Sequence, residues 1–102
     1  MAAQKIDITN RDGKRISVLF DHAAHDKGLA FVMHGLGGFK EQEHIAMFAQ
    51  AFRDHHLTAV RFDTRNTFGE SEGLYEDANI TNYYEDLDDV IAWAKRQPWY
   101  RE

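Results

Sequence analysis

Apolar residues at every second position dominate the first part of the chain. Ile6 and Ile8 alternate with polar residues, and a second alternating run covers residues 16–20. A period of two is typical of a strand with one buried face. The interval between the runs, residues 10–13, ends in an Asp-Gly pair that can adopt the positive φ of a tight turn. The pattern therefore predicts a β-hairpin.

The middle of the chain contains two short apolar runs separated by a helical pattern. Residues 29–33 are apolar without alternation, which is typical of a strand buried on both faces in a parallel sheet. Residues 57–62 form a second β-rich run. Between them, acidic residues come early and His55 and His56 come late, as expected for a helix whose carboxyl end these histidines cap. The residues expected on its apolar face are Ile45, Phe48, Ala49 and Phe52.

The last part of the chain predicts a long helix that begins near residues 79–82 and stops before Pro98. Asn82 and Glu85 fit a capping box. Acidic side chains are expected on its solvent face and aromatic ones in the core or in helix packing. The expected apolar face is Tyr84, Leu87, Val90, Ile91 and Ala94, the acidic residues are Glu85, Asp86, Asp88 and Asp89, and the aromatic residues are Tyr83, Tyr84, Trp93, Trp99 and Tyr100.

These elements follow one another in the order β-β-β-α-β-α, which predicts the α/β class. The β-α-β unit implies two parallel strands joined by a right-handed crossover. A length of 102 residues is enough for one small domain but not for two. We therefore expect residues 1–102 to belong to a single domain.

Composition excludes several classes of function. The net charge is −5 and the basic residues are scattered singly, which disfavours a nucleic-acid partner. Without cysteine, neither a disulfide nor a thiolate zinc site can form. No segment approaches the ~20 apolar residues of a membrane span. Because the start of the chain is polar rather than typical of a signal peptide, we expect a cytoplasmic location.

Two motifs follow the two strands of the β-α-β unit. The first is HGLGG at residues 34–38, and the second is DTRNTFGES at residues 63–71. Glycines free the main chain to point N–H groups into a cleft, and the carboxyl ends of parallel strands are where such sheets bind ligands. A plain glycine-rich turn between strand and helix is the simpler interpretation.

Together the motifs resemble those of the α/β-hydrolase superfamily, most of all its small serine esterases, acyl hydrolases and serine-aminopeptidase-like members. Asn66 stands where that family usually has glycine. The resemblance implies that the chain is the N-terminal part of an α/β-hydrolase sheet, incomplete without later strands. It also implies hydrolysis of a small-molecule carboxylic ester or related acyl substrate, with no cofactor.

In that family the loop after the third strand provides half of the oxyanion hole, through the backbone N–H of the residue after His-Gly. Carried over, this residue is Leu36. The resemblance implies that the main chain of Gly35, Gly37 and Gly38 supports the loop and that His34 shapes it.

The string GESEG at residues 69–73 matches G-x-S-x-G, the pattern around many nucleophilic serines. A nucleophile elbow places the serine between a strand and a helix, whereas Ser71 lies well beyond Phe62 and well before the next predicted helix. All six histidines precede Ser71, although the fold uses the order serine, acid, histidine. We predict that Ser71 is not the nucleophile and that the chain alone is inactive, without catalytic serine, acid or histidine.

Other interpretations stay open. A triad in another order could combine His34, Asp63 and Ser71. A nucleotide-binding half-domain of Rossmann type could use the glycine turn and Asp63, although Lys40 stands where G-x-G-x-x-G requires glycine. A non-catalytic interaction domain could use the same scaffold. A metal site or a solvated loop could form from Asp21, His22, His25 and Asp26.

The resemblance finally implies that the strand at residues 29–33 is central in the complete sheet, next to the strand that carries the nucleophile. In this chain its second edge would stay open, and an open apolar edge is a template for aggregation. We expect the remainder of the hydrolase domain, or another copy of the chain, to complete the sheet.

Overall fold

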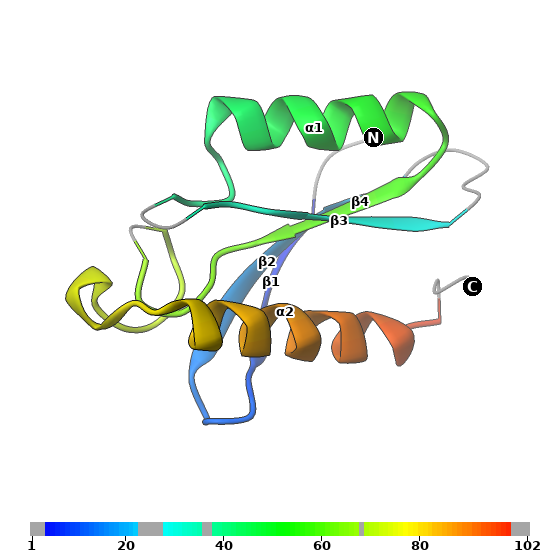
Figure 1. Cartoon of the computed structure of the whole chain (residues 1–102). Helices are drawn as coiled ribbons and strands as arrows, with labels where there is room; N and C mark the ends of the chain where they lie inside the picture. The colour runs from blue at the N-terminus through cyan, green and yellow to red at the C-terminus, as the bar shows by residue number, and fades with distance from the viewer. Residues whose placement is uncertain (1–3, 23–27, 36–37, 68, 99–102) are drawn as a thin grey trace.

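A computed structural model describes residues 4–22, 28–35, 38–67 and 69–98. Its elements follow the predicted order, with one short 3-10 helix added before the last helix (Figure 1). They are β1 (Gln4–Thr9), β2 (Arg15–Asp21), β3 (Leu29–Met33), α1 (Glu43–Asp54), β4 (Thr58–Phe62), η1 (Tyr75–Asp77) and α2 (Ile80–Lys95).

The four strands form one mixed sheet in the order β1-β2-β4-β3. β1 and β2 make the predicted antiparallel hairpin, and β4 pairs antiparallel with β2. β3 and β4, the strands on either side of α1, pair in parallel. The α/β class and the parallel β-α-β unit are therefore confirmed.

Turn chemistry at the hairpin is as the sequence predicts. The Asn10 side chain accepts hydrogen bonds from the backbone N–H groups of Asp12 and Lys14, at 3.0 and 2.9 Å. Gly13 has φ +77°, a conformation in which glycine avoids the steric penalty of a Cβ atom.

The two helices cover opposite faces of the sheet (Figure 1). The side chains of β4 alternate between them, since Val60 and Phe62 belong to the cluster that includes α2 and Ala59 to the cluster that includes α1. The larger cluster consists of Ile16, Val18, Phe20, Val60, Phe62, Val90, Trp93 and Ala94, and the smaller one of Val32, Ile45, Ala49 and Ala59.

β3 differs from its prediction. It was expected to be buried on both faces, but of its five residues only Val32 is buried. Within the described strands β3 pairs with β4 alone and forms one edge of the sheet. An apolar run without alternation is therefore only partly covered here.

The ends of the helices also refine the sequence analysis. The N-cap of α2 is Asn79, whose side chain accepts from the Asn82 N–H, so the predicted capping role of Asn82 is wrong. α1 ends at the C-cap His55, and His56 follows with φ +65°. Within the described residues, no helix is long and apolar enough to cross a membrane.

The apolar faces of both helices are displaced from those predicted. Tyr83 is buried, at 2% exposure, whereas Tyr84 is 65% exposed. On α1, Ile45 and Ala49 are buried but Phe48 is 56% exposed. The predicted helical period is correct, but each predicted apolar face includes a side chain, Tyr84 or Phe48, that the described residues leave exposed.

The acidic run of α2 is not simply a solvent face. Asp86 is fully buried, and its carboxylate accepts from Nε and Nη2 of Arg65 at 3.1 and 2.9 Å. It also accepts from Asn10 at 2.9 Å. Asp89 accepts from both the backbone and the guanidinium of Arg11. These contacts fasten α2 to the hairpin turn and to the loop after β4.

Candidate functional site

His34 follows β3 directly and connects it to the loop after β4. The backbone N–H of Thr64 donates to Nε2 over 3.1 Å, which leaves the ring proton on Nδ1, 2.8 Å from the Gly35 carbonyl oxygen. The ring is buried and contacts Tyr83 edge to face. Burial lowers the pKa of His34 below its usual range, so the imidazole is neutral near pH 7.

The glycine-rich loop is closed on itself. The Gly38 N–H donates to the Gly35 carbonyl oxygen over 2.9 Å, and the Thr67 hydroxyl donates to the Gly38 carbonyl. A Cβ atom at Gly38 would displace the end of the Gln42 side chain and would lie only 3.0 Å from His34 Cβ and 3.1 Å from the Gly35 carbonyl oxygen, so this position favours glycine. Leu36 and Gly37, two of the predicted site residues, lie outside the described residues.

Lys40, two residues after the glycine-rich loop, forms a fully buried ion pair with Asp63, which follows β4. One carboxylate oxygen of Asp63 accepts from the Lys40 backbone N–H at 2.7 Å, and the other accepts from the Lys40 ammonium at 2.8 Å. The Glu70 N–H donates to Asp63 as well, at 2.8 Å. Asp63 thus joins the ends of both loops through three hydrogen bonds.

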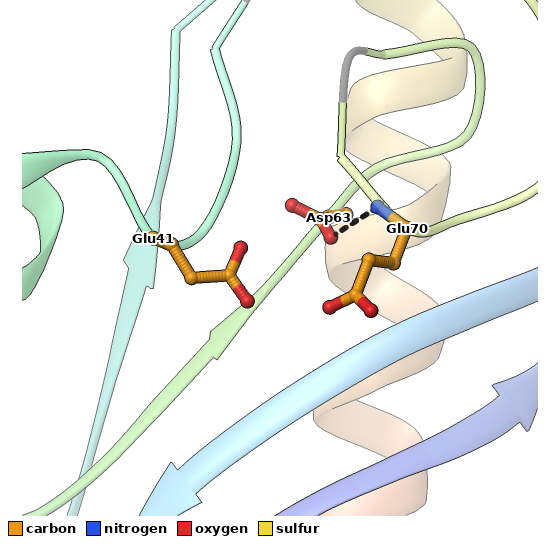
Figure 2. A group of neighbouring side chains, drawn as sticks. All are labelled: Glu41, Asp63 and Glu70. Carbon is orange, nitrogen blue, oxygen red and sulfur yellow. Dashed lines mark hydrogen bonds between the residues drawn. The ribbon is translucent and has the colours of Figure 1, made fainter.

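Two further carboxylates complete this group, which we call the Lys40 clamp: Lys40, Asp63, Glu41 and Glu70. Figure 2 shows the three acidic side chains converging from the turn before α1, the end of β4 and the following loop. The Lys40 ammonium lies 2.8 Å from Asp63, 2.8 Å from Glu70 and 2.9 Å from Glu41. The position in which these oxygens could bind a metal ion is therefore filled by the ammonium group of Lys40.

The charges of the clamp shift its pKa values in the directions expected for matched partners. Burial acts to lower the pKa of Lys40, but hydrogen bonds with Asp63, Glu70 and Glu41 outweigh burial and raise it. Hydrogen bonding from Lys40, and then from Lys5, lowers the pKa of Glu70 to about 2. Lys40 and Glu70 are therefore both charged at neutral pH.

Ser71, the candidate nucleophile of the GESEG string, uses its hydroxyl within the fold. Its Oγ donates to the Asp63 carbonyl oxygen and accepts from the Ser17 N–H at 2.8 Å. The side chain is buried, at 7% exposure. The His34 ring nitrogens bond to Gly35 and Thr64 instead, so the described contacts do not assemble a triad from His34, Asp63 and Ser71.

Each remaining residue of the string has a structural contact of its own. A Cβ atom at Gly69 would overlap the Asp63 carboxylate. The Glu72 N–H donates to the Arg15 carbonyl oxygen, and the Glu72 carbonyl oxygen accepts from the Asn66 N–H. Gly73 has φ +111° and approaches the Asn66 side chain too closely for a Cβ atom. Asn66 itself has φ +60°, which explains why asparagine, tolerant of this conformation, can stand where the family usually has glycine.

The other candidate constellation is only partly described. The Asp21 carboxylate lies 3.4 Å from Nη2 of Arg61, and His22 contacts Phe20 edge to face. His25 and Asp26 lie outside the described residues. The described half of this proposed metal site is thus engaged with protein side chains.

An open apolar groove of about 270 Å³ lies between the end of β3 and the first turns of α2. Its one buried hydroxyl, Tyr83 Oη, has no hydrogen-bond partner among the described residues. Ile80 and Tyr84 at its border are 68% and 65% exposed. We call this surface the α2 groove, and it is lined by Met33, His34, Gly35, Ile80, Tyr83, Tyr84 and Leu87.

The central role of Lys40 could not be inferred from the sequence, which suggested only that Lys40 breaks a nucleotide-binding pattern. Its partner Asp63 is 23 residues away, and no periodicity relates the two positions. A lysine within a glycine-rich and aromatic stretch next to a turn was the one available signal.

Comparison with known proteins identifies the fold. No protein-family model matches the sequence, and no curated protein matches it. Among solved structures, the chain is similar to Est1E from Butyrivibrio proteoclasticus with ferulic acid bound, with a TM-score of 0.86 and 21% identity over 95% of this chain and 39% of that one. An α/β serine hydrolase without a lid from Xanthomonas campestris gives a TM-score of 0.76 and 25% identity over 95% of this chain and 46% of that one.

An esterase from Pyrococcus furiosus is similar as well, with a TM-score of 0.80 and 20% identity over 95% of this chain and 35% of that one. The chain therefore has the fold of the α/β hydrolases, as its motifs predicted. It spans less than half the length of each of these neighbours.

Proposed function

We propose that this chain provides the oxyanion-hole loop of a serine hydrolase that cleaves carboxylic esters or related acyl bonds. The observation that carries the proposal is the fastening of the glycine-rich loop at the carboxyl ends of β3 and β4. His34, Gly38 and Lys40 each bond to the loop after β4. A main-chain donor held in this way stays in place while charge develops on a substrate oxygen.

In this mechanism the Leu36 N–H donates to the carbonyl oxygen of the substrate as it becomes an oxyanion. One such donor stabilises the transition state by about 3–4 kcal/mol in enzymes where it has been removed. The main chain of Gly35, Gly37 and Gly38 keeps the loop close to the substrate, and neutral His34 fixes its first residue. The charges of the Lys40 clamp are paired with one another.

The rest of the chemistry requires groups that we do not assign to this chain. A serine Oγ attacks the carbonyl carbon while a histidine takes its proton, and the alcohol leaves with that proton. Water then repeats the sequence on the acyl-serine to release the acid. Ser71 is unsuited to the first step because its hydroxyl proton and one lone pair are used by Asp63 and Ser17.

We also propose that the partner of this chain is the remainder of a hydrolase domain, with a second copy of the chain as the alternative. The free edge of β3 and the α2 groove are adjacent, so one strand followed by one helix could cover both. Size-exclusion chromatography of the 102-residue chain tests this proposal. Association supports it, and a monomer that melts cooperatively contradicts it.

The substrate class can be narrowed only by the neighbours. The Est1E structure holds ferulic acid, so esters of aromatic carboxylic acids are the first substrates to assay, beside short p-nitrophenyl esters. A cytoplasmic location is part of the same proposal. The nucleotide-binding alternative has lost support, because the Asp63 carboxylate is occupied by Lys40 and Glu70.

Fluorophosphonate labelling with peptide mapping tests the proposed function. The 102-residue chain is expected to stay unlabelled, whereas a protein that continues this sequence through the rest of the domain is expected to label at a serine beyond it. The Ser71→Ala variant of the longer protein should still be labelled at that serine. Labelling of Ser71, or no labelling of the longer protein, would refute the proposal.

A further inference from the structure

The contacts at Lys40 involve more than a pair of charges, because the main chain of this residue is bound as well as its side chain. The Lys40 N–H donates to Asp63 at 2.7 Å, and the Lys40 carbonyl oxygen accepts from Nη1 of Arg61 at 3.1 Å. The backbone N–H and carbonyl oxygen of Lys40 are thus both bound by side chains, one from β4 and one from the residue that follows it. These contacts fix the position of the Lys40 main chain relative to β4.

The other end of the clamp is anchored by the GESEG string. The Glu70 carboxylate accepts a hydrogen bond from the Lys40 ammonium group on one oxygen and from that of Lys5 in β1 on the other, at 2.8 Å each. The Glu70 N–H bonds Asp63, and Ser71 links Asp63 to Ser17 of β2. The string therefore connects β2 and the residue after β4 to the loop after β3, whereas the contact with Lys5 of β1 is half-exposed.

We propose that Lys40 is a positioning residue of the oxyanion loop, and that the GESEG string is the brace that holds Lys40 in place. This inference rests on the proposed function, since it assigns Lys40 a part in placing the Leu36 N–H. Without the ammonium ion, Asp63 and Glu70 repel each other and the loop after β4 separates from the loop after β3. The glycine-rich loop then samples positions in which its donor misses the oxyanion.

Two variants of the full-length protein test the role of Lys40. Lys40→Met removes the ammonium and keeps the length of the side chain. Lys5→Met is the matched control, because it removes the other cation on Glu70 and leaves the buried pair intact. Ester hydrolysis is measured per active site, counted by fluorophosphonate titration, well below the melting temperature.

Lys40→Met is expected to lower kcat per active site roughly 10- to 100-fold with KM changed less than about twofold, as small misplacements of catalytic groups do. Lys5→Met should stay within about twofold of the wild type. Unchanged kcat in a folded Lys40→Met protein would overturn the inference. If Lys40→Met does not fold, Glu70→Gln takes its place, with a smaller loss of kcat expected and no loss contradicting it.

Amide hydrogen exchange distinguishes failure of this inference from failure of the proposed function. Exchange at the Gly38 and residue-40 amides, both hydrogen-bonded here, should accelerate about tenfold or more in Lys40→Met and not in Lys5→Met. This readout requires no catalysis, so it applies even if the wild type hydrolyses no ester. Equal exchange in all three proteins would show that Lys40 does not position the loop.

Discussion

The Lys40 clamp and the α2 groove lie at the same end of the molecule but differ in how complete they are. In the clamp, a fully buried lysine has three carboxylate partners, and Asp63 uses both of its oxygens. In the groove, Ile80 and Tyr84 are exposed, and the Tyr83 hydroxyl has no partner among the described residues. The polar half of the site is satisfied within this chain, whereas the apolar half is not.

The difference teaches which part of the proposed site this chain can build alone. Unpaired charges in a protein interior are costly, so the clamp must be complete wherever the fold forms. Uncovered apolar surface is tolerated until a partner buries it, although it favours association. We therefore expect substitutions in the clamp to affect folding and substitutions in the groove to affect assembly.

Substitution of Asp63 should have the largest effect on stability and is the strongest test of this difference between the clamp and the groove. Asp63→Ala leaves the Lys40 ammonium without its fully buried countercharge and should lower the free energy of unfolding by about 3–5 kcal/mol. The control Asp88→Ala removes an exposed acid that pairs with Arg11 and should cost less than about 1 kcal/mol. Urea unfolding followed by circular dichroism measures both. Equal small losses would mean that the clamp is not a buried ion pair.

The positive φ of Asn66 gives the next largest effect. Asn66→Val places a β-branched residue at φ +60° and removes the hydrogen bond to the Asp77 carbonyl, at an expected cost of about 1–3 kcal/mol. Asn66→Gly, the matched variant, keeps the conformation accessible and should lose about 1 kcal/mol or less. Urea unfolding again separates the two. If valine were tolerated as well as glycine, the turn would not require this conformation.

His34 should make the free energy of unfolding of the chain depend on pH. Its pKa is lower in the folded chain, so between the folded value and about 6.5 the unfolded chain binds the extra proton. Stability should therefore fall as the pH decreases below about 6.5, by at most about 1.4 kcal/mol per pH unit from this group. Urea unfolding from pH 8 to pH 5 should show a shallower fall in His34→Gln. The exposed-histidine control His44→Gln should retain the wild-type slope.

Substitutions in the α2 groove test whether its exposed side chains contribute to association rather than to stability. The double variant Ile80→Ser with Tyr84→Ser changes exposed side chains, so the free energy of unfolding should move by about 0.5 kcal/mol or less. Light scattering should nevertheless detect weaker self-association of the chain, because less apolar surface is offered to a partner. Unaltered association would place the contact surface elsewhere.

Local patterns in the sequence predicted most of the fold. The hairpin, the order of elements and the parallel pairing depend on periodicity and turn chemistry, which nearby residues determine. The burial of β3, Tyr84 and Phe48 was wrong because periodicity finds an apolar face but not what covers it. Asp86 was assigned to solvent because its partner Arg65 comes from a distant loop. Lys40 was missed for the same reason, since a buried pair across two loops leaves no local pattern.

A crystal structure of a longer protein that continues this sequence, labelled by a fluorophosphonate, would test the central claim most directly. The adduct mimics the tetrahedral intermediate, so its phosphoryl oxygen marks the oxyanion position. Our account predicts an adduct on a serine beyond this chain, with that oxygen about 2.7–3.1 Å from the Leu36 backbone nitrogen. An adduct on Ser71, or an oxyanion bound away from the glycine-rich loop, would contradict it.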